Sequence, residues 1–165
     1  MAETIISHRP DLSKKEQYEI LFPLLQSLIG EEKDAVANLS NLMAALKYGM
    51  NYFWVGCYFV KEDELVLGPF QGPVACTRIK KGKGVCGASW EKKHTLIVKN
   101  VEEFPGHIAC SVFSKSEIVI PFIVKNEVFL VLDIDSDELA AFDETDKFYL
   151  EKFLELLRNS IEKSF

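Results

Sequence analysis

The sequence predicts an α+β fold in which an antiparallel sheet carries helices on one face and a roof of loops over a pocket on the other. Apolar residues recur at helical spacing near both ends of the chain, whereas the middle is dense in aromatic and β-branched residues. The 165 residues fit one domain, and a hydrophobic fraction of 48% is enough for a proper core. We therefore expect an arm and helices over residues 1–50, the sheet and roof over 51–142, and a last helix over 143–165.

Two helices are predicted before the sheet. Ser13 can cap the first helix, with Glu16 at the capping-box position. Pro23 lies inside this helix and is expected to kink it or to split it in two. The second helix is predicted from about residue 31 to 48 and is expected to end at Gly49.

Six strands are predicted in meander order, with one short helix among them, because polar or glycine-containing turns separate β-rich runs. The strands are expected over residues 52–60, 65–70, 74–79, 95–98, 117–124 and 127–135, and the short helix over 85–93. Residues 99–115 are expected to be loop or short helix. Asp143 is predicted to cap the last helix, with Asp146 at its third position.

Charge and hydropathy exclude several classes of protein. A net charge of −6 argues against nucleic acid or an anionic membrane as the main partner. The chain has no apolar run of the length of a signal peptide or a membrane span, so we expect a cytoplasmic protein whose cysteines rest as thiols. No C-x-x-C pair occurs among Cys57, Cys76, Cys86 and Cys110, which disfavours a zinc ribbon or a thioredoxin-type motif. These cysteines are either buried structural thiols or a redox set.

The last predicted strand separates apolar and acidic side chains by alternation. One face carries Val128, Leu130, Leu132 and Ile134, and the other carries Phe129, Val131, Asp133 and Asp135. The two aspartates either meet solvent at the strand end or form the floor of a pocket. In a pocket their mutual repulsion would raise at least one pKa and retain a proton, or the pair could hold a cationic amine. Glu117, on the neighbouring strand, either joins them or lies in water at the sheet edge.

Trp54 and Tyr58 share one face of the first strand, with Gly56 between them. Aromatic residues in strands are usually core residues. A glycine, however, allows close approach to the sheet, and two rings beside such a gap could enclose a small apolar group such as a methyl.

The remaining cysteines are predicted in three different settings. Cys76 is expected in a strand, and Cys86 at a helix start, where the helix dipole would lower the pKa of its thiol. Cys110 is expected on the loop after His107, as a thiolate if a cation or backbone N–H groups face it. Metal binding by His107 and Cys110 is only weakly supported by two ligands at that spacing.

Four segments, in their order and spacing, resemble the free methionine-(R)-sulfoxide reductases, a family built on a single GAF domain: GPFQGPVACTRI, GKGVCG, GHIACSVFSKSEIVIP and VLDIDS. The similarity runs from about residue 51 to 142. One departure is Cys57, which stands where the family pattern has no cysteine. Alternation turns Cys57 away from Trp54 and Tyr58, so it is predicted to lie in the core.

The resemblance implies roles for three cysteines. It implies that Cys110 is the attacking nucleophile and that Cys76 and Cys86 are resolving thiols, with Cys76 favoured for the main disulfide. It implies a substrate pocket shaped by Trp54, Tyr58, Glu117, Asp133 and Asp135. Glu117 and Asp135 are then candidates for the acid, Asp133 for positioning, and His107 for loop support.

The resemblance also implies an activity, with an alternative. The activity is the reduction of free methionine (R)-sulfoxide through a sulfenic acid and a disulfide that thioredoxin reduces, with no bound cofactor and no metal. The alternative is a non-catalytic GAF sensor of a small ligand, which would have the same fold. The cysteines discriminate between the reductase and the sensor, because a sensor does not need three thiols around one pocket. The apolar N-terminal helices could supply a homodimer interface.

Overall fold

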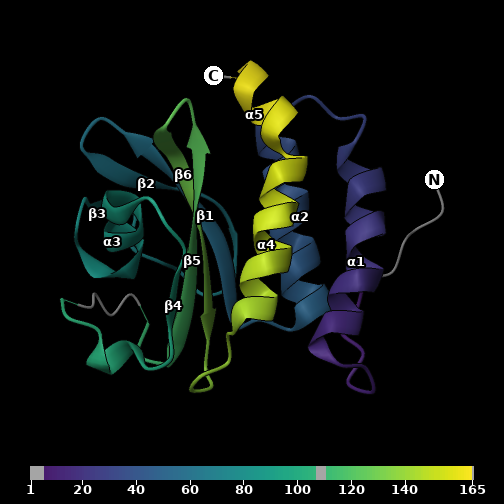
Figure 1. Ribbon diagram of the computed structural model, residues 1–165, viewed down its shortest axis with the longest axis horizontal. Helices are drawn as coiled ribbons and strands as arrows, with labels where there is room; N and C mark the ends of the chain where they lie inside the picture. Colours follow the sequence, from purple (N-terminus) through teal and green to yellow (C-terminus); the bar gives the residue numbers. More distant parts are fainter. Residues whose placement is uncertain (1–5, 107–110, 165) are drawn as a thin grey trace.

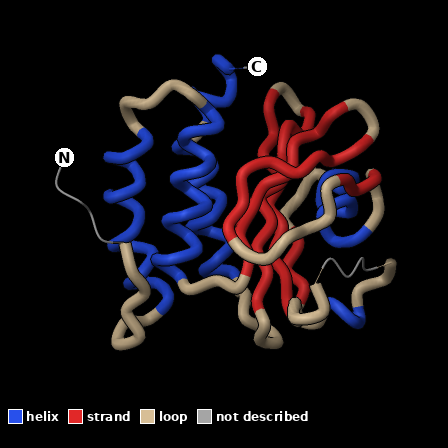
Figure 2. The backbone as a smooth tube through the Cα atoms, turned by 180° about the vertical axis from the view of Figure 1, so that it is seen from behind, coloured by secondary structure: helices blue, strands red, loops and turns tan. Residues whose placement is uncertain are grey.

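The computed structural model describes residues 6–106 and 111–164 and confirms the α+β fold (Figure 1). A six-stranded antiparallel sheet has a layer of helices on one face and a short helix with loops on the other (Figures 1 and 2). The helical layer consists of α1 (Lys14–Ile29), α2 (Ala35–Met50), α4 (Glu144–Leu156) and α5 (Arg158–Ser164). Helix α3 (Gly84–Lys92) lies on the opposite side of the sheet. In the described part of the chain no helix is long and apolar enough to cross a membrane.

The strands form two meanders that meet in the middle of the sheet. Their spatial order is β3-β2-β1-β6-β5-β4, so the first and last strands of the chain lie side by side. The strands are β1 (Trp54–Lys61), β2 (Glu64–Gln71), β3 (Arg78–Lys80), β4 (Leu96–Val98), β5 (Ser116–Val124) and β6 (Glu127–Ser136). Pairing of β1 with β6 brings together residues that are about 80 positions apart, such as Trp54 and Asp135. The sequence predicted one meander in which each strand lies beside the next one in the chain. The structure instead has two halves, β1 to β3 and β4 to β6, joined where β1 pairs with β6.

The predicted capping boxes are both present. Ser13 and Glu16 cap α1, and Asp143 and Asp146 cap α4. Pro23 does not split α1, which is continuous from Lys14 to Ile29.

Two predicted helices differ from the structure: one has different ends, and the other is broken in two. Helix α2 begins at Ala35, because Asp34 caps it, and ends at Met50, with Asn51 in the left-handed conformation. Gly49 lies inside α2, where a Cβ atom would be 3.2 Å from a methyl carbon of Leu21, so this glycine serves the close approach of α1. The last helix is not continuous, because it breaks at Leu157 between α4 and α5.

The sheet separates two apolar clusters. The larger one lies between the sheet and the helical layer and includes Leu130, Leu132 and Ile134, as alternation predicts. The smaller one lies on the side of α3 and includes Trp54, Tyr58 and Val131 among others. A pocket on this second side is therefore lined by the residues of β1, β5 and β6 that point away from the helices.

The alternation predicted for β6 is wrong at its start. Val128 packs in the cluster on the α3 side, whereas Phe129 packs against the helix-side cluster. The physical reason is a bulge, since the pairing of β5 with β6 shifts between Phe122 and Ile123. One extra residue in a strand reverses the faces of the residues beyond it.

The third strand is shorter than predicted. Only Arg78–Lys80 pair with β2, so Cys76 lies in a loop and not in a strand. This loop follows Gly72 and Pro73, leaves Val74 88% exposed and passes over the α3 side of the sheet. The consequence is that Cys76 directly follows loop residues that line the pocket, Pro73 to Ala75.

Candidate active site

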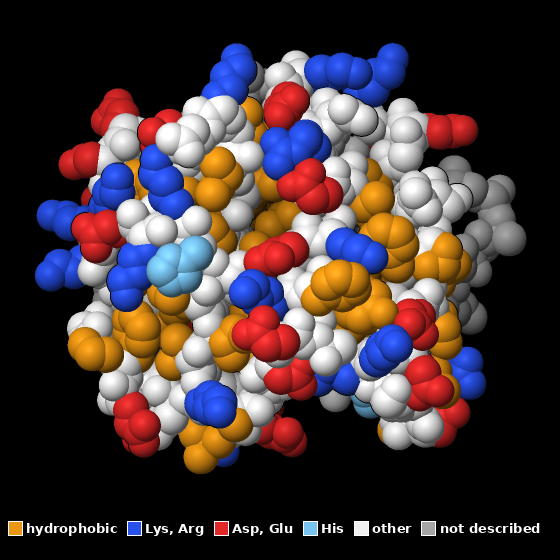
Figure 3. Space-filling model, viewed as in Figure 1, with side chains coloured by type: hydrophobic (Ala, Val, Ile, Leu, Met, Phe, Trp, Pro, Cys, Tyr) orange, Lys and Arg blue, Asp and Glu red, His pale blue; other side chains and the backbone are white. Residues whose placement is uncertain are grey.

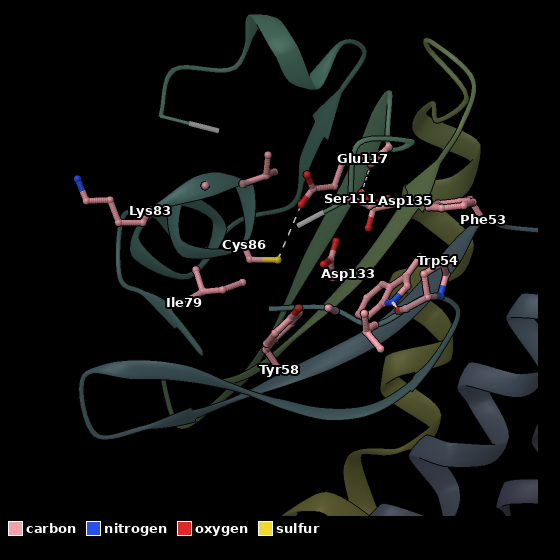
Figure 4. Close-up of a pocket in the computed structure, with 16 residues that line it drawn as sticks. Phe53, Trp54, Tyr58, Ile79, Lys83, Cys86, Ser111, Glu117, Asp133 and Asp135 are labelled. Carbon is pink, nitrogen blue, oxygen red and sulfur yellow. Dashed lines mark hydrogen bonds between the residues drawn. The ribbon is translucent and has the colours of Figure 1, made fainter. Parts of the chain in front are cut away.

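A cavity of about 570 Å³, its open mouth included, lies between the sheet and the roof formed by α3 and two loops (Figure 4). Its floor comes from adjacent strands and contains Trp54, Tyr58, Glu117, Asp133 and Asp135. Its roof includes Pro73, Ala75, Val85, Cys86, Ser111 and Ser114. The structure thus brings together every sequence-predicted pocket residue of the sheet.

The three acidic residues of the floor lie in two neighbouring rows across the strands. Asp135 is the direct partner of Glu117 on β5 and of Trp54 on β1. Asp133, two residues along β6, faces Val119 and Gly56 in the next row. Glu117 and Asp133 are each only 6% exposed, and β4 covers the outer edge of Glu117. The solvent-facing alternatives for Glu117 and Asp133 are therefore wrong, whereas Asp135 is partly exposed.

Burial raises the pKa of all three carboxyl groups, and repulsion between the acids adds to the rise for Glu117 and Asp133. For Glu117 burial is the larger cause of a pKa well above its usual range, followed by the charges of Asp133 and Asp135. For Asp133 burial again dominates, followed by the charge of Asp135. Burial raises the pKa of Asp135 to about 6, although a hydrogen bond from Ser114 opposes the shift. These carboxyl groups therefore hold their protons more strongly than exposed carboxyl groups do.

Cys86 is a buried thiol beside these acids. Its Sγ lies 3.8 Å from Oε1 of Glu117, within reach of a weak hydrogen bond (Figure 4). Burial, followed by the charges of Asp133 and Glu117, raises the pKa of this thiol well above its usual value. The expectation that the helix dipole lowers the pKa is thus wrong, because loss of solvation and two nearby acids outweigh the dipole of a nine-residue helix.

Cys76 is disulfide-bonded, whereas Cys57 and Cys86 are free. Pro73 and Ala75, which come just before Cys76 in the chain, line the cavity. Cys110 and His107, the predicted nucleophile and its neighbour, lie outside the described residues.

Known proteins with this arrangement were found at high similarity. GAF domain-containing protein A of Dictyostelium discoideum is 57% identical over 148 residues, which cover 89% of this chain and 94% of that protein. The free methionine-R-sulfoxide reductase of Escherichia coli is 41% identical over 137 residues, covering 82% and 83% of the two chains. The chain belongs to the free methionine-R-sulfoxide reductase family.

The solved structures agree with this assignment. Free methionine-R-sulfoxide reductase from Neisseria meningitidis, solved with its substrate, is 47% identical, covers 96% of both chains and superposes with a TM-score of 0.91. Models of protein families gave no match to this chain. Members of the free methionine-R-sulfoxide reductase family are oxidoreductases that act on a sulfur group, so the chain is an enzyme with a GAF-type fold.

The position at which the chain departs from the reductase pattern is a core position. Cys57 is fully buried in the cluster on the helical side, and its Sγ lies 3.6 Å from the carbonyl oxygen of Pro69. Burial raises the pKa of this thiol to about 12. The prediction that Cys57 is a core residue is confirmed.

Trp54 and Tyr58 line the cavity as predicted, but the gap expected between them at Gly56 is filled. The rings of Trp54 and Tyr58 stack with centroids 6.2 Å apart, and the indole Nε1 of Trp54 donates to the carbonyl oxygen of Pro73 at 2.9 Å. The space above Gly56 is not open, because a Cβ there would lie 2.2 Å from the ring of Trp54 and 2.7 Å from Cβ of Phe70. Gly56 therefore gives room to the Trp54 ring, not to a ligand.

Sequence reasoning missed several pocket residues on the roof. Ser114 donates a hydrogen bond to Oδ1 of Asp135 and thereby links the roof loop to the acidic floor. Ser111 lines the cavity beside it, and Phe53 lines the mouth, edge-on to Phe113. The small polar residues before β5 were the available signal, but nothing in a single sequence indicates which of them faces an acid.

Among the described residues, one set of side chains could hold a metal ion. Cys86, Glu117 and Asp133 each offer a ligand atom, and these atoms lie within 4.8 Å of one another. Oδ1 of Asp133 is buried and has no hydrogen-bond partner within the described part of the chain.

A second hollow opens on the other side of β5, between the sheet and α4 (Figure 3). Apolar side chains such as Phe122 and Phe148 lie along it, and its rim carries both signs of charge, including Arg158 and Glu155. No cysteine lines this hollow as far as the structure describes it. The pocket on the α3 side is therefore the candidate active site.

Proposed function

We propose that this protein reduces free L-methionine (R)-S-oxide to L-methionine and that thioredoxin, an external dithiol protein, regenerates it. One observation carries the proposal: the carboxyl groups of Glu117, Asp133 and Asp135, the first two buried, lie on the floor of a cavity whose roof includes residues just before disulfide-bonded Cys76. A sulfoxide needs a proton at its oxygen and a thiol at its sulfur, and this site offers both kinds of group side by side. The preference for the R isomer and for the free amino acid is carried over from the relatives.

The pocket has complementary places for the parts of the substrate. The stacked rings of Trp54 and Tyr58 offer an apolar surface for the S-methyl group. The acids of the floor favour the substrate ammonium group. The first turn of α3 is open to an anion, because its N-cap, Lys83, makes no side-chain cap hydrogen bond, and Val85 and Cys86 line the cavity. Free N–H groups at a helix start suit the substrate carboxylate.

The first chemical step transfers the oxygen from the substrate to the enzyme. The thiolate of Cys110 attacks the sulfoxide sulfur while an acid protonates the oxygen. This attack forms a sulfur–sulfur bond. The protonated oxygen then moves from the substrate sulfur to the sulfur of Cys110 as the substrate's sulfur–oxygen bond and the new sulfur–sulfur bond break, so methionine leaves and Cys110 remains as a sulfenic acid. The substrate sulfur is thereby reduced by two electrons and the cysteine sulfur is oxidised by two.

The following steps restore the thiol. The thiol of Cys76 condenses with the sulfenic acid, a disulfide bond forms, and one water molecule leaves. Thioredoxin then reduces the disulfide by two thiol–disulfide exchanges and becomes oxidised itself. We assign Cys86 as a second resolving thiol only, because it is buried beside Glu117 and its raised pKa leaves little thiolate.

The surroundings of the three acids suggest different roles in proton donation and substrate positioning. Glu117 and Asp135 are direct cross-strand partners and are our candidates for the proton donor. Asp133 lies in the next row, beside Gly56, and is assigned to positioning the substrate. Ser114 holds Asp135 in place through its hydrogen bond. No bound cofactor or metal is required by any of these steps.

A non-catalytic sensor of a small ligand is the alternative function, since GAF folds serve both purposes. The disulfide beside the pocket argues against it, because ligand sensing requires no redox-active thiol there. Turnover distinguishes the two functions: a sensor would bind methionine sulfoxide without consuming it.

The test is an assay that couples the protein to thioredoxin, thioredoxin reductase and NADPH. We expect NADPH oxidation with free L-methionine (R)-S-oxide, formation of an equal amount of methionine, and little reaction with the S isomer. A Cys110→Ser variant should lose all turnover, and a Cys76→Ser variant should complete one turnover and then slow. NADPH oxidation that persists in Cys110→Ser would contradict the assignment of the nucleophile, and absence of methionine formation in the wild type would favour the sensor.

A homodimer stays a prediction of this proposal. Helix α1 leaves Ile20 and Leu28 44% and 42% exposed, and their spacing of eight residues places them on a similar face of the helix. Sedimentation of the wild type and of an Ile20→Glu variant would test whether this face joins two copies.

A further inference from the structure

We propose that the pocket contains an inhibitory site for a thiophilic divalent cation, Zn²⁺ above all, with Cys86, Glu117 and Asp133 as its ligands. The three residues come from α3, β5 and β6, and their ligand atoms all lie within 4.8 Å of one another. They are Sγ of the thiol and one oxygen of each carboxyl group, and Figure 4 shows all three side chains projecting into the same cavity.

The distances suit zinc without rearrangement of the backbone. Zn–S and Zn–O bonds of about 2.3 and 2.1 Å at a tetrahedral angle place sulfur and oxygen about 3.6 Å apart. Sγ of Cys86 and Oε1 of Glu117 are 3.8 Å apart. Small rotations of the two carboxyl groups would bring the set to coordination distance.

The second observation is a polar atom without a partner. Asp133 is 6% exposed, and its Oδ1 makes no hydrogen bond within the described residues. A buried carboxylate oxygen without a partner is costly, and a cation beside it would remove that cost. Two acids and a thiol held together in a low-dielectric pocket provide no internal positive charge, so a divalent cation satisfies all three at once.

The ligand chemistry selects the metal. Magnesium and calcium prefer oxygen ligands only, whereas a thiolate with two carboxylates suits zinc. Three protein ligands leave a fourth position, which opens into the cavity and can be taken by water. A metal there would occupy the acids that the proposed reaction uses, so the site is inhibitory and not a resident cofactor site.

The experiment uses the oxidised full-length protein with Zn²⁺ alone and no added thiol. In this form Cys76 is held in a disulfide, so its thiol does not compete for the metal. Equilibrium dialysis followed by metal analysis should show one zinc ion per chain. Cys86→Ala should weaken binding at least about tenfold, because it removes a direct ligand. The matched control is Cys57→Ala, which removes the other free thiol of the described residues, on the opposite side of the sheet, and should leave binding unchanged.

Two further measurements keep the test decisive if Cys86→Ala does not fold. Asp133→Asn should also weaken zinc binding at least about tenfold. Co²⁺ bound to the wild-type protein should give a thiolate-to-metal absorption band that Cys57→Ala retains. Absence of zinc binding, or binding that neither Cys86→Ala nor Asp133→Asn weakens, would overturn the proposal. The binding of zinc fails or holds independently of whether the protein reduces methionine sulfoxide, and only its inhibitory effect rests on the proposed function.

Discussion

Glu117 and Asp135 face each other directly across β5 and β6, on the floor of the cavity beneath α3 and the roof loops. Directly opposed residues of an antiparallel pair have Cβ atoms only about 5 Å apart, and like charges at that distance destabilise the sheet. Burial adds to this cost. A sheet that keeps two carboxyl groups in such a pair gives up stability, and the compensation that we propose is a proton available to the sulfoxide oxygen.

Removal of either carboxyl group should therefore slow the reaction while leaving the fold at least as stable. Asp135→Asn and Glu117→Gln are each expected to lower kcat about 10²- to 10⁴-fold, the range for loss of a general acid. Their melting temperatures should equal or exceed that of the wild type, because repulsion on the floor is relieved. Steady-state kinetics and thermal melts measure both effects.

The control is Asp137→Asn, which removes an exposed carboxyl group just beyond the end of β6. Its kcat should remain within about twofold of the wild type, because surface charges contribute little. An unchanged rate in Asp135→Asn would remove this residue from the acid role. A rate loss accompanied by an equal loss in the control would point to a non-specific charge effect.

Gly56→Ala should damage the pocket through Trp54. The added methyl group would lie 2.2 Å from the Trp54 ring, so the ring must move away from Tyr58. We expect destabilisation by about 1–3 kcal/mol from overpacking. KM should rise, because the apolar surface for the methyl group is disrupted. Denaturant titration measures the destabilisation, tryptophan fluorescence the displacement of the ring, and kinetics the change in KM. Unchanged fluorescence and an unchanged KM would contradict this prediction.

The sequence predicts the parts of this molecule that local patterns control. Alternation placed Leu132 and Asp133 on opposite faces, and capping boxes located the starts of α1 and α4. The bulge opposite Phe122 was not predictable, because it depends on pairing between two strands and not on either strand alone.

The pKa shifts and hydrogen bonds of the site could not be predicted from the sequence alone. A cysteine at a helix start was expected to be acidic, but the structure surrounds Cys86 with two acids from other strands. The contact of Ser114 with Asp135 likewise joins a loop to a strand, and no spacing rule encodes it. The surroundings of Cys86 and the contact of Ser114 depend on residues that are distant in the sequence. The motifs indicated a shared pocket only through the family resemblance.

Cys57 should resist alkylation in the native protein. Burial raises the pKa of its thiol to about 12, and the side chain is fully enclosed. Only the thiolate reacts with iodoacetamide, so labelling at pH 8 should be negligible and should rise about tenfold for each pH unit while the fold persists. Mass spectrometry after timed labelling measures this rate, and denatured protein is the positive control. Rapid labelling of Cys57 at pH 8 in folded protein would contradict the core assignment.

Tyr18→Phe should test the polar network on the helical side of the sheet. Tyr18 donates a hydrogen bond of 2.8 Å to Oδ1 of Asp146, and the hydroxyl groups of Tyr18 and Tyr52 also contact each other. Asp146 is fully buried, and Lys14 contacts its other oxygen at 2.6 Å. Loss of a hydrogen bond to a charged group should cost about 1.5–3 kcal/mol.

The matched control for this network is Tyr149→Phe, whose hydroxyl group donates at 3.2 Å to the half-exposed Glu19. Its free energy of unfolding should change by less than about 1 kcal/mol, as for a solvent-accessible interaction. Neither substitution should alter kcat, because both hydroxyl groups lie across the sheet from the acidic pocket. Equal destabilisation in the two variants would show that the buried network adds nothing to an ordinary tyrosine hydrogen bond. A fall in kcat for Tyr18→Phe alone would instead show that the position of α1 is coupled to the active site through β1.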